Sequence, residues 1–115
     1  MKVPQMRPFV GKEEYSAIAD CFETNWLTEG PKSKEFVRRL CAMAGVEYGV
    51  LAPNCTLGLF LGLKAMGVGP GDEVIVPNFT FIASATSVVL AGATPIFVDV
   101  NEYDLQIDVR DCERV

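Results

Sequence analysis

Histidine is absent from the 115 residues of this sequence. Histidine is the commonest general base and the commonest metal ligand in proteins, so the chain lacks the usual residue for either role. The four cysteines are widely spread and include no C-x-x-C pair: Cys21, Cys41, Cys55 and Cys112. Because zinc and redox motifs need close spacing, we expect no metal site and four reduced, mostly buried thiols of a cytoplasmic protein.

Long apolar runs and basic clusters are also missing. No apolar run approaches the roughly 18 residues of a membrane span, and the charges between Lys2 and Glu13 leave no room for the apolar region of a secretory signal. The net charge of −5, without a basic cluster, argues against a nucleic-acid-binding surface. We therefore expect a cytosolic protein with neither a nucleic acid nor a membrane as its partner.

The composition is that of a globular chain. Half of the residues are hydrophobic and 22% are charged, which excludes a disordered protein. A chain of this length holds one domain with a modest core. Since the sequence has no general positive field, an anionic ligand has to be held by local backbone dipoles.

One stretch combines a strand pattern, a polar turn and a helix pattern. Residues 48–52 are continuously apolar apart from a glycine and end at a proline, which predicts a buried strand. Residues 57–63 are mostly leucine and favour a packed helix, and the polar turn 53–56 lies between the two. A helix start carries unpaired N–H groups and partial positive charge. The turn is therefore predicted to hold a phosphate at the carboxyl end of a strand.

Strand and helix patterns alternate through the rest of the chain. This alternation predicts an α/β fold with a parallel sheet that is buried on both faces. The expected elements are a helix from Lys12 to about Thr24, a helix capped by Ser33 and ended by Gly45, a strand at 74–76, a helix at 82–90 capped by Thr80, a strand at 96–98, and a last helix begun by Asp108 with Asp111. Three strands followed by an unfinished helix suggest the amino-terminal part of a longer enzyme.

Two common nucleotide-binding motifs do not fit. The only glycine cluster, at 67–71, follows a helix and precedes a strand, which is the wrong edge of the sheet for a dinucleotide fold, and there is no P-loop pattern. Two polar strand-to-helix turns remain, at 53–56 and 78–81. One offers N–H groups and a hydroxyl for a phosphate, and the other offers an aromatic face for a planar ring. Pyridoxal 5′-phosphate combines these two groups.

Five segments occur in the order and approximate spacing of a known family: WLTEGP at 26–31, CTLGL at 55–59, GPGDEVIVP at 69–77, TFIA at 80–83 and AGATPIFVDV at 91–100. With them the chain resembles the first third of the DegT/StrS family of sugar aminotransferases, which use pyridoxal phosphate. The resemblance implies the amino-terminal part of a fold type I large domain, a three-layer αβα structure with a mostly parallel sheet. It implies an arm, a helix and a loop at the mouth of the active site in residues 1–31, and an incomplete cofactor-binding domain in residues 32–115.

The resemblance also implies cofactor-binding roles. Thr56, with the backbone N–H of Leu57, matches the position that binds the cofactor phosphate; the alternative is that Thr56 is an ordinary N-cap. Asn54 and Cys55 replace the serine and glycine that are usual before this threonine, and Cys55 is expected to be a small buried residue. Phe81 matches the aromatic residue that stacks on the pyridine ring; the alternative is a plain core phenylalanine.

Two further positions lie near the implied site. Thr28 belongs to the loop that lines the mouth of the site in the family and is the candidate substrate-binding residue; the alternative is that Gly30 and Pro31 merely turn the chain. The aspartate that pairs with the pyridine nitrogen is expected beyond Val115, so Asp99 is predicted to be an acceptor that organises its loop.

The lysine that would form the Schiff base with the cofactor is not identified. None of the candidates has a context like that of the family, and Lys64 is expected to be a solvated residue: Lys2, Lys12, Lys32, Lys34 and Lys64. No catalytic residue is therefore assigned within these 115 residues.

The implied activity is that of a pyridoxal-phosphate-dependent aminotransferase in polysaccharide biosynthesis. It would convert a nucleotide-linked keto-sugar to an amino-sugar, commonly with glutamate as amino donor, and the parent enzyme would be a homodimer. The segment by itself is expected to be inactive. Two alternatives stay open: a non-catalytic binding or regulatory module of the same fold, and a pyridoxal-phosphate-dependent sugar dehydratase in which a histidine replaces the lysine.

Overall fold

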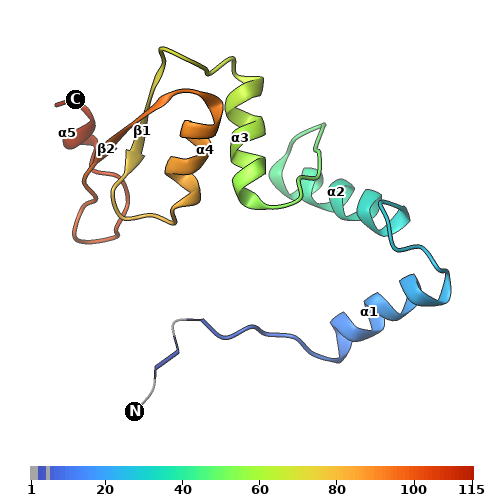
Figure 1. Cartoon of the computed structure of the whole chain (residues 1–115). Helices are drawn as coiled ribbons and strands as arrows, with labels where there is room; N and C mark the ends of the chain where they lie inside the picture. The colour runs from blue at the N-terminus through green and yellow to red at the C-terminus, as the bar shows by residue number, and fades with distance from the viewer. Residues whose placement is uncertain (1–2, 5) are drawn as a thin grey trace. The chain divides into compact units, whose positions relative to one another are not determined.

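The computed structural model describes residues 3–4 and 6–115 and divides the chain into two compact units, Met1–Val50 and Leu51–Val115 (Figure 1). Met1, Lys2 and Gln5, which belong to the predicted arm, lie outside the described residues, and so does the candidate lysine at position 2. The predicted division at residue 31 stays a prediction.

The first unit contains two helices, α1 (Lys12–Glu23) and α2 (Pro31–Ala44), as predicted. The predicted cap at Ser33 is wrong, because α2 begins two residues earlier with Gly30 as its N-cap. Proline suits the first helical position, where its fixed φ fits the helix and its missing N–H has no intrahelical partner to lose. Gly45 ends α2 in the left-handed conformation, with φ of 68°, as its sequence position predicts.

The second unit is built on a strand–helix–strand unit. Its elements in chain order are α3 (Cys55–Ala65), β1 (Glu73–Pro77), α4 (Ala83–Ala91), β2 (Thr94–Val98) and the short α5 (Val109–Cys112). The two strands pair in parallel, from Glu73 opposite Thr94 to Pro77 opposite Val98. The strands predicted at 74–76 and 96–98, the predicted helices of this unit and the parallel pairing are confirmed.

The core of this unit lies between the strand pair and the helices. Val76, Val88 and Ala93 form a buried cluster, against which Leu63, Val68, Val74 and Ala85 pack. α4 contacts both strands and α3 packs on α4. Ile75 points to the opposite face by strand alternation and is 44% exposed. In the described part of this unit α4 packs against both strands, and the opposite face is partly open at Ile75. Burial of the sheet on both faces stays a prediction.

The strand predicted at residues 48–52 does not form. The segment has no strand conformation, and Tyr48 is 81% exposed. A strand needs a neighbour to take up its backbone hydrogen bonds, and in the described part of the chain neither β1 nor β2 pairs with this segment. The apolar composition of this segment was therefore not sufficient to make it a strand.

The ends of α4 and α5 agree only in part with the sequence-based caps. Gly92 ends α4 with φ of 88°, as predicted. Thr80 does not cap α4, because the N-cap is Ile82 and the Thr80 hydroxyl instead bonds that of Ser84 at 2.9 Å. Asp108 caps α5, as predicted, by accepting a hydrogen bond from the N–H of Arg110 at 2.9 Å.

Two expectations drawn from composition can be compared with the structure. All four cysteines are free thiols, and three of them are half-buried. Cys55, the first residue of α3, is exposed, so its predicted role as a small buried residue is wrong. Within the described residues, no helix combines the length and the apolar character that crossing a membrane requires.

The buried cluster makes a specific prediction about stability. Val88 is 2% exposed, whereas its neighbour in α4, Val89, is 60% exposed. Val88→Ala removes two buried methyl groups and is expected to lower the free energy of unfolding by about 2 kcal/mol. Val89→Ala is the matched control and is expected to change it by less than about 0.5 kcal/mol. Both substitutions alter helix propensity equally, so urea denaturation of the two variants isolates the effect of burial. Equal unfolding midpoints would contradict the burial of Val88 in the core.

Candidate cofactor-binding site

Asn54 organises the turn before α3. Its backbone is extended, with φ of −162° and ψ of 169°, and its carbonyl accepts the N–H of Gly58 at 3.0 Å. Its side-chain Oδ1 accepts the N–H of Leu57, also at 3.0 Å. Asn54 is therefore the N-cap of α3, and the alternative that Thr56 is the N-cap is wrong.

The first turn of α3 has a limited set of free donors. The N–H groups of Cys55 and Thr56, and the hydroxyl of Thr56, bond no protein atom in the described part of the chain. The N–H of Leu57, the other predicted phosphate donor, is occupied by Asn54. An anion at this helix start would meet two amides and one hydroxyl, aided by the positive end of the helix dipole. This donor set suits a phosphate, and binding by Leu57 would require Asn54 to release its N–H.

Phe81 lies in the turn between β1 and α4. The N–H of Asn78 donates to the carbonyl of Val98 at 2.8 Å, so this turn begins at the carboxyl end of the strand pair. Phe81 accepts the N–H of Ser84 at its carbonyl, at 3.0 Å, while its side chain is 78% exposed. The alternative of a plain core phenylalanine is therefore wrong. The ring offers an open aromatic face.

The two turns lie at the same end of a helix pair. α3 and α4 pack against each other, and Figure 1 shows both running in the same direction, so that their first turns lie together. Thr56 is in the first turn of α3, and Phe81 comes two residues before α4. The sequence had suggested that the turn at 53–56 follows a strand, but no strand forms before it. The packing of α3 on α4 therefore brings the two turns together. A common cofactor crevice for Thr56 and Phe81 stays a prediction.

Thr28 belongs to the first unit, where it lines a cavity of about 690 Å³. The wall is largely apolar and includes Ile18, Phe22, Trp26 and Leu27. The ammonium group of Lys32, which also lines the cavity, lies 2.8 Å from a carboxylate oxygen of Asp20. This hydrogen bond raises the pKa of Lys32 above its usual value. Thr28 therefore lines a cavity that is large enough to take a small molecule.

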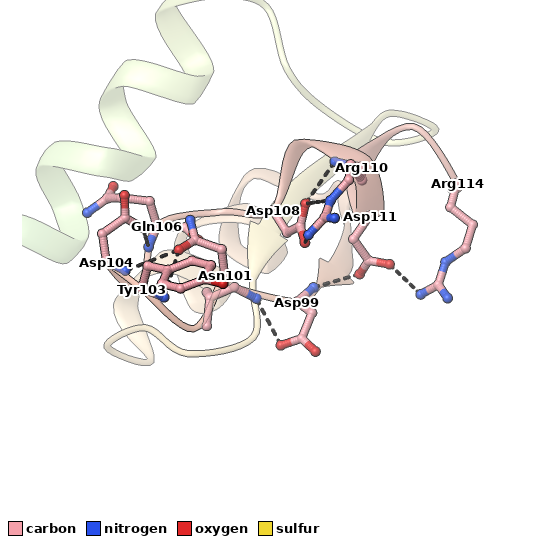
Figure 2. A network of polar contacts seen from close by, with 10 residues as sticks. Asp99, Asn101, Tyr103, Asp104, Gln106, Asp108, Arg110, Asp111 and Arg114 are labelled. Carbon is pink, nitrogen blue, oxygen red and sulfur yellow. Dashed lines mark hydrogen bonds and ion pairs between the residues drawn. The ribbon is translucent and has the colours of Figure 1, made fainter.

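Asp99 organises its loop, as predicted (Figure 2). Its carboxylate accepts the N–H of Val100 at 2.8 Å, and its carbonyl accepts the N–H of Asp108 at 2.9 Å. Its own N–H donates to the carboxylate of Asp111 at 2.7 Å, and Asp111 also pairs with Arg114. Asp111 thus joins the loop to α5 and does not complete a capping box with Asp108.

Two of the candidate lysines have protein partners. Lys64 is exposed, as expected for a solvated residue, and its ammonium group donates to the carbonyl of Val68 at 3.1 Å. Lys32 is paired with Asp20. No group of three or more histidine, cysteine, aspartate or glutamate residues in the described part of the chain is arranged to hold a metal ion.

Two contacts near the candidate residues were missed from the sequence. Asn54 lies three residues before Leu57, which is the spacing of an N-cap bond, and this signal was available. The indole Nε1–H of Trp26 donates to the carbonyl of Glu29 at 3.0 Å. No periodic pattern marks a bond of that kind, because it joins a side chain to the backbone of an irregular loop.

Comparisons with known proteins agree with this fold. A model of the DegT/DnrJ/EryC1/StrS aminotransferase family matches residues 8–115. The chain is 42% identical over 106 residues to the spore coat polysaccharide biosynthesis protein SpsC of Bacillus subtilis, covering 92% of this chain and 27% of that protein. It is 38% identical over 107 residues to a UDP-4-amino-4-deoxy-L-arabinose–oxoglutarate aminotransferase of Shewanella sediminis, covering 93% of this chain and 28% of that protein. The chain thus spans between a quarter and a third of these relatives.

A solved structure extends the likeness to three dimensions. The sugar aminotransferase Spr1654 of Streptococcus pneumoniae, in its PLP form, has a TM-score of 0.87 and 35% sequence identity, covering 99% of this chain and 29% of that chain. The same protein in its PMP form gives the same TM-score. The predicted fold class, that of the amino-terminal part of a fold type I pyridoxal-phosphate enzyme, is confirmed.

The capping bond of Asn54 can be tested directly. Asn54→Ala removes the acceptor of the Leu57 N–H and is expected to lower the free energy of unfolding by about 1 kcal/mol. Asn54→Asp keeps an acceptor at the same place and is expected to change it by less than about 0.5 kcal/mol. Urea denaturation followed by far-UV circular dichroism measures both. Equal stability of the alanine variant and the parent chain would mean that this bond does not hold the turn.

Proposed function

The chain belongs to the DegT/DnrJ/EryC1/StrS aminotransferase family, and we propose that in its parent enzyme it binds the phosphate and the ring of pyridoxal 5′-phosphate. The enzyme would transfer an amino group, commonly from glutamate, to a nucleotide-linked keto-sugar. The name of the relative from Shewanella sediminis includes a UDP-linked amino-sugar and oxoglutarate, which is what glutamate becomes when it gives up its amino group. The name of the relative from Bacillus subtilis supports polysaccharide biosynthesis as the setting.

The free donors at the start of α3 carry the proposal. Two N–H groups, of Cys55 and Thr56, and the Thr56 hydroxyl have no protein acceptor among the described residues. α3 has 11 residues, which is long enough for its dipole to favour an anion at its start. With a net charge of −5, the chain has no general attraction for a phosphate. Binding therefore depends on these local groups, and the N–H of Leu57 joins them when Asn54 releases it.

Phe81 would orient the ring of the cofactor. Phe81 comes two residues before α4 and its side chain is exposed, and an aromatic ring prefers an offset stack against another planar ring. The pyridine ring of the bound cofactor supplies an electron sink. Thr56 and Phe81 would fix the cofactor at its two ends, so that it presents one face to the substrate. Neither residue takes part in proton transfer.

The remaining roles belong to the same proposal. Thr28 would bind the substrate from the wall of its cavity. No lysine of the chain has been matched to the Schiff-base position, so this 115-residue chain by itself would not transaminate. The parent enzyme would be a homodimer, because family sites are completed by the neighbouring subunit. It would be cytoplasmic.

The phosphate site predicts a difference between two ligands. Pyridoxamine 5′-phosphate and pyridoxamine differ only in the phosphate, and neither carries the aldehyde that reacts with surface lysines. Thr56→Ala is expected to weaken binding of the phosphorylated ligand about tenfold, the value of one hydrogen bond to a charged group. Its effect on pyridoxamine should be negligible, and Thr56→Ser should retain the parent affinity. Isothermal titration calorimetry measures the affinity of each of the three proteins for each of the two ligands. An unchanged ratio of the two affinities in Thr56→Ala would place the phosphate elsewhere.

The ring site predicts the opposite pattern. Phe81→Leu removes the aromatic face but keeps an apolar side chain, and is expected to weaken binding by a factor of about three to ten. The loss should be the same for pyridoxamine 5′-phosphate and for pyridoxamine, because both carry the same ring. Phe79→Leu, at an exposed position of the same turn, is the matched control and should leave both affinities unchanged. Equal effects of the two substitutions would contradict a stacking role for Phe81.

A further inference from the structure

The loop between α1 and α2 is tied together by one side chain. The backbone N–H of Trp26 donates to the carbonyl of Cys21 at 3.0 Å, which joins the start of the loop to α1. The indole Nε1–H of the same residue crosses the loop to the carbonyl of Glu29, also at 3.0 Å. Among the described residues, residues 27–29 of the loop make no other hydrogen bond. The indole is therefore the polar link that closes this loop.

The same indole rests directly on Gly30. Gly30 is the one buried residue in the described part of the first unit. A Cβ atom at Gly30 would overlap the indole Nε1 and would lie 2.5 Å from Cδ1, far inside contact distance. The backbone of Gly30 is extended, with φ of −159°, a conformation that any residue adopts. Position 30 therefore needs a glycine because a side chain would overlap the indole, and not because its backbone conformation requires one.

Thr28 lies at the middle of the closed loop. It is flanked by Trp26 and Gly30, and all three line the same cavity. The other link between the helices at this cavity is the ion pair of Lys32 with Asp20, in which both side chains are mostly exposed. Exposed pairs contribute little to order. The position of Thr28 therefore depends chiefly on the contact of Trp26 with Glu29 and Gly30.

We propose that Trp26 is a positioning residue: by bonding Glu29 and resting on Gly30, it holds Thr28 in the wall of the cavity in the place where the nucleotide-linked sugar binds. This inference rests on the proposed substrate-binding role of Thr28. Trp26 acts through the loop, and the hydroxyl of Thr28 makes the contact. Its removal should loosen Thr28 without unfolding the chain, because the buried cluster lies in the other unit.

The first measurement follows the indole itself. Trp26 is the only tryptophan of the sequence, so intrinsic fluorescence reports its environment alone. Gly30→Ala is expected to expel the indole, shifting the emission to longer wavelength and increasing quenching by acrylamide. Gly62→Ala is the matched control, since a Cβ at that helical glycine meets no atom within 4 Å, and its emission should match that of the parent. Identical emission in Gly30→Ala and the parent would overturn the contact with Gly30.

The second measurement follows Thr28. Trp26→Phe keeps an aromatic ring but removes the N–H that bonds Glu29. Nitrogen-15 relaxation should give the Thr28 amide an order parameter of about 0.85 in the parent chain and below about 0.6 in Trp26→Phe. The amides of α4 should be unaffected, which separates a local effect from loss of the fold. An unchanged order parameter at Thr28 would overturn the positioning role.

The third measurement joins the loop to the ligand. With UDP-glucose as the probe, Trp26→Phe should bind about five- to tenfold more weakly than the parent chain, the value of one lost hydrogen bond. In a Thr28→Ala background the same change should cause no further loss. An equal loss in both backgrounds would mean that Trp26 acts on the ligand without Thr28, which overturns the inference. If the parent chain and all variants fail to bind UDP-glucose, the substrate role of Thr28 fails, and the order parameter of Thr28 still decides whether Trp26 positions it.

Discussion

The parallel pairing of β1 with β2 through α4 is the constraint on which the second unit depends. Val76, Val88 and Ala93 come from a strand, the helix that follows it and the turn before the next strand, so the core closes only when these elements cross over correctly. This closure brings the turn that contains Phe81 and the loop that begins at Asp99 to the carboxyl edge of the strand pair. Open α/β sheets bind ligands at this edge. The core thus determines where the aromatic face is presented.

The start of α3 combines two demands that compete for the same amide. A helix start needs acceptors for its first N–H groups, and Asn54 supplies one for Leu57. A phosphate at the same place would need those N–H groups free. The structure satisfies both demands in part, since the amides of Cys55 and Thr56 stay free while that of Leu57 is capped. Asn54 therefore stabilises the helix in the absence of an anion and reduces the number of donors that an arriving phosphate meets.

Local signals predicted the elements well but not what lies between them. Pro77 and Gly92 mark where β1 and α4 end, and short apolar runs marked both strands. The strand expected around Tyr48 failed because its backbone finds no neighbour among the described residues, which composition does not reveal. Thr80 was a plausible cap by type, yet its hydroxyl bonds Ser84. The sequence pattern singled out the turns that contain Thr56 and Phe81, and the family resemblance gave these residues and Thr28 their roles. The spacing of Asn54 and Leu57 signalled one of the surrounding contacts, whereas the bond of Trp26 to Glu29 became visible only in three dimensions.

The two units maintain their candidate residues by different means. In the second unit a buried cluster holds the strand pair and α4, so the turn at Phe81 is fixed by packing that several residues share. In the described part of the first unit only Gly30 is buried, and order in the loop rests on hydrogen bonds and one aromatic contact. Hydrogen bonds of this kind contribute about 1 kcal/mol each. Thr28 should therefore respond to a single substitution in its loop, while the turn at Phe81 should change only when the core itself is disturbed.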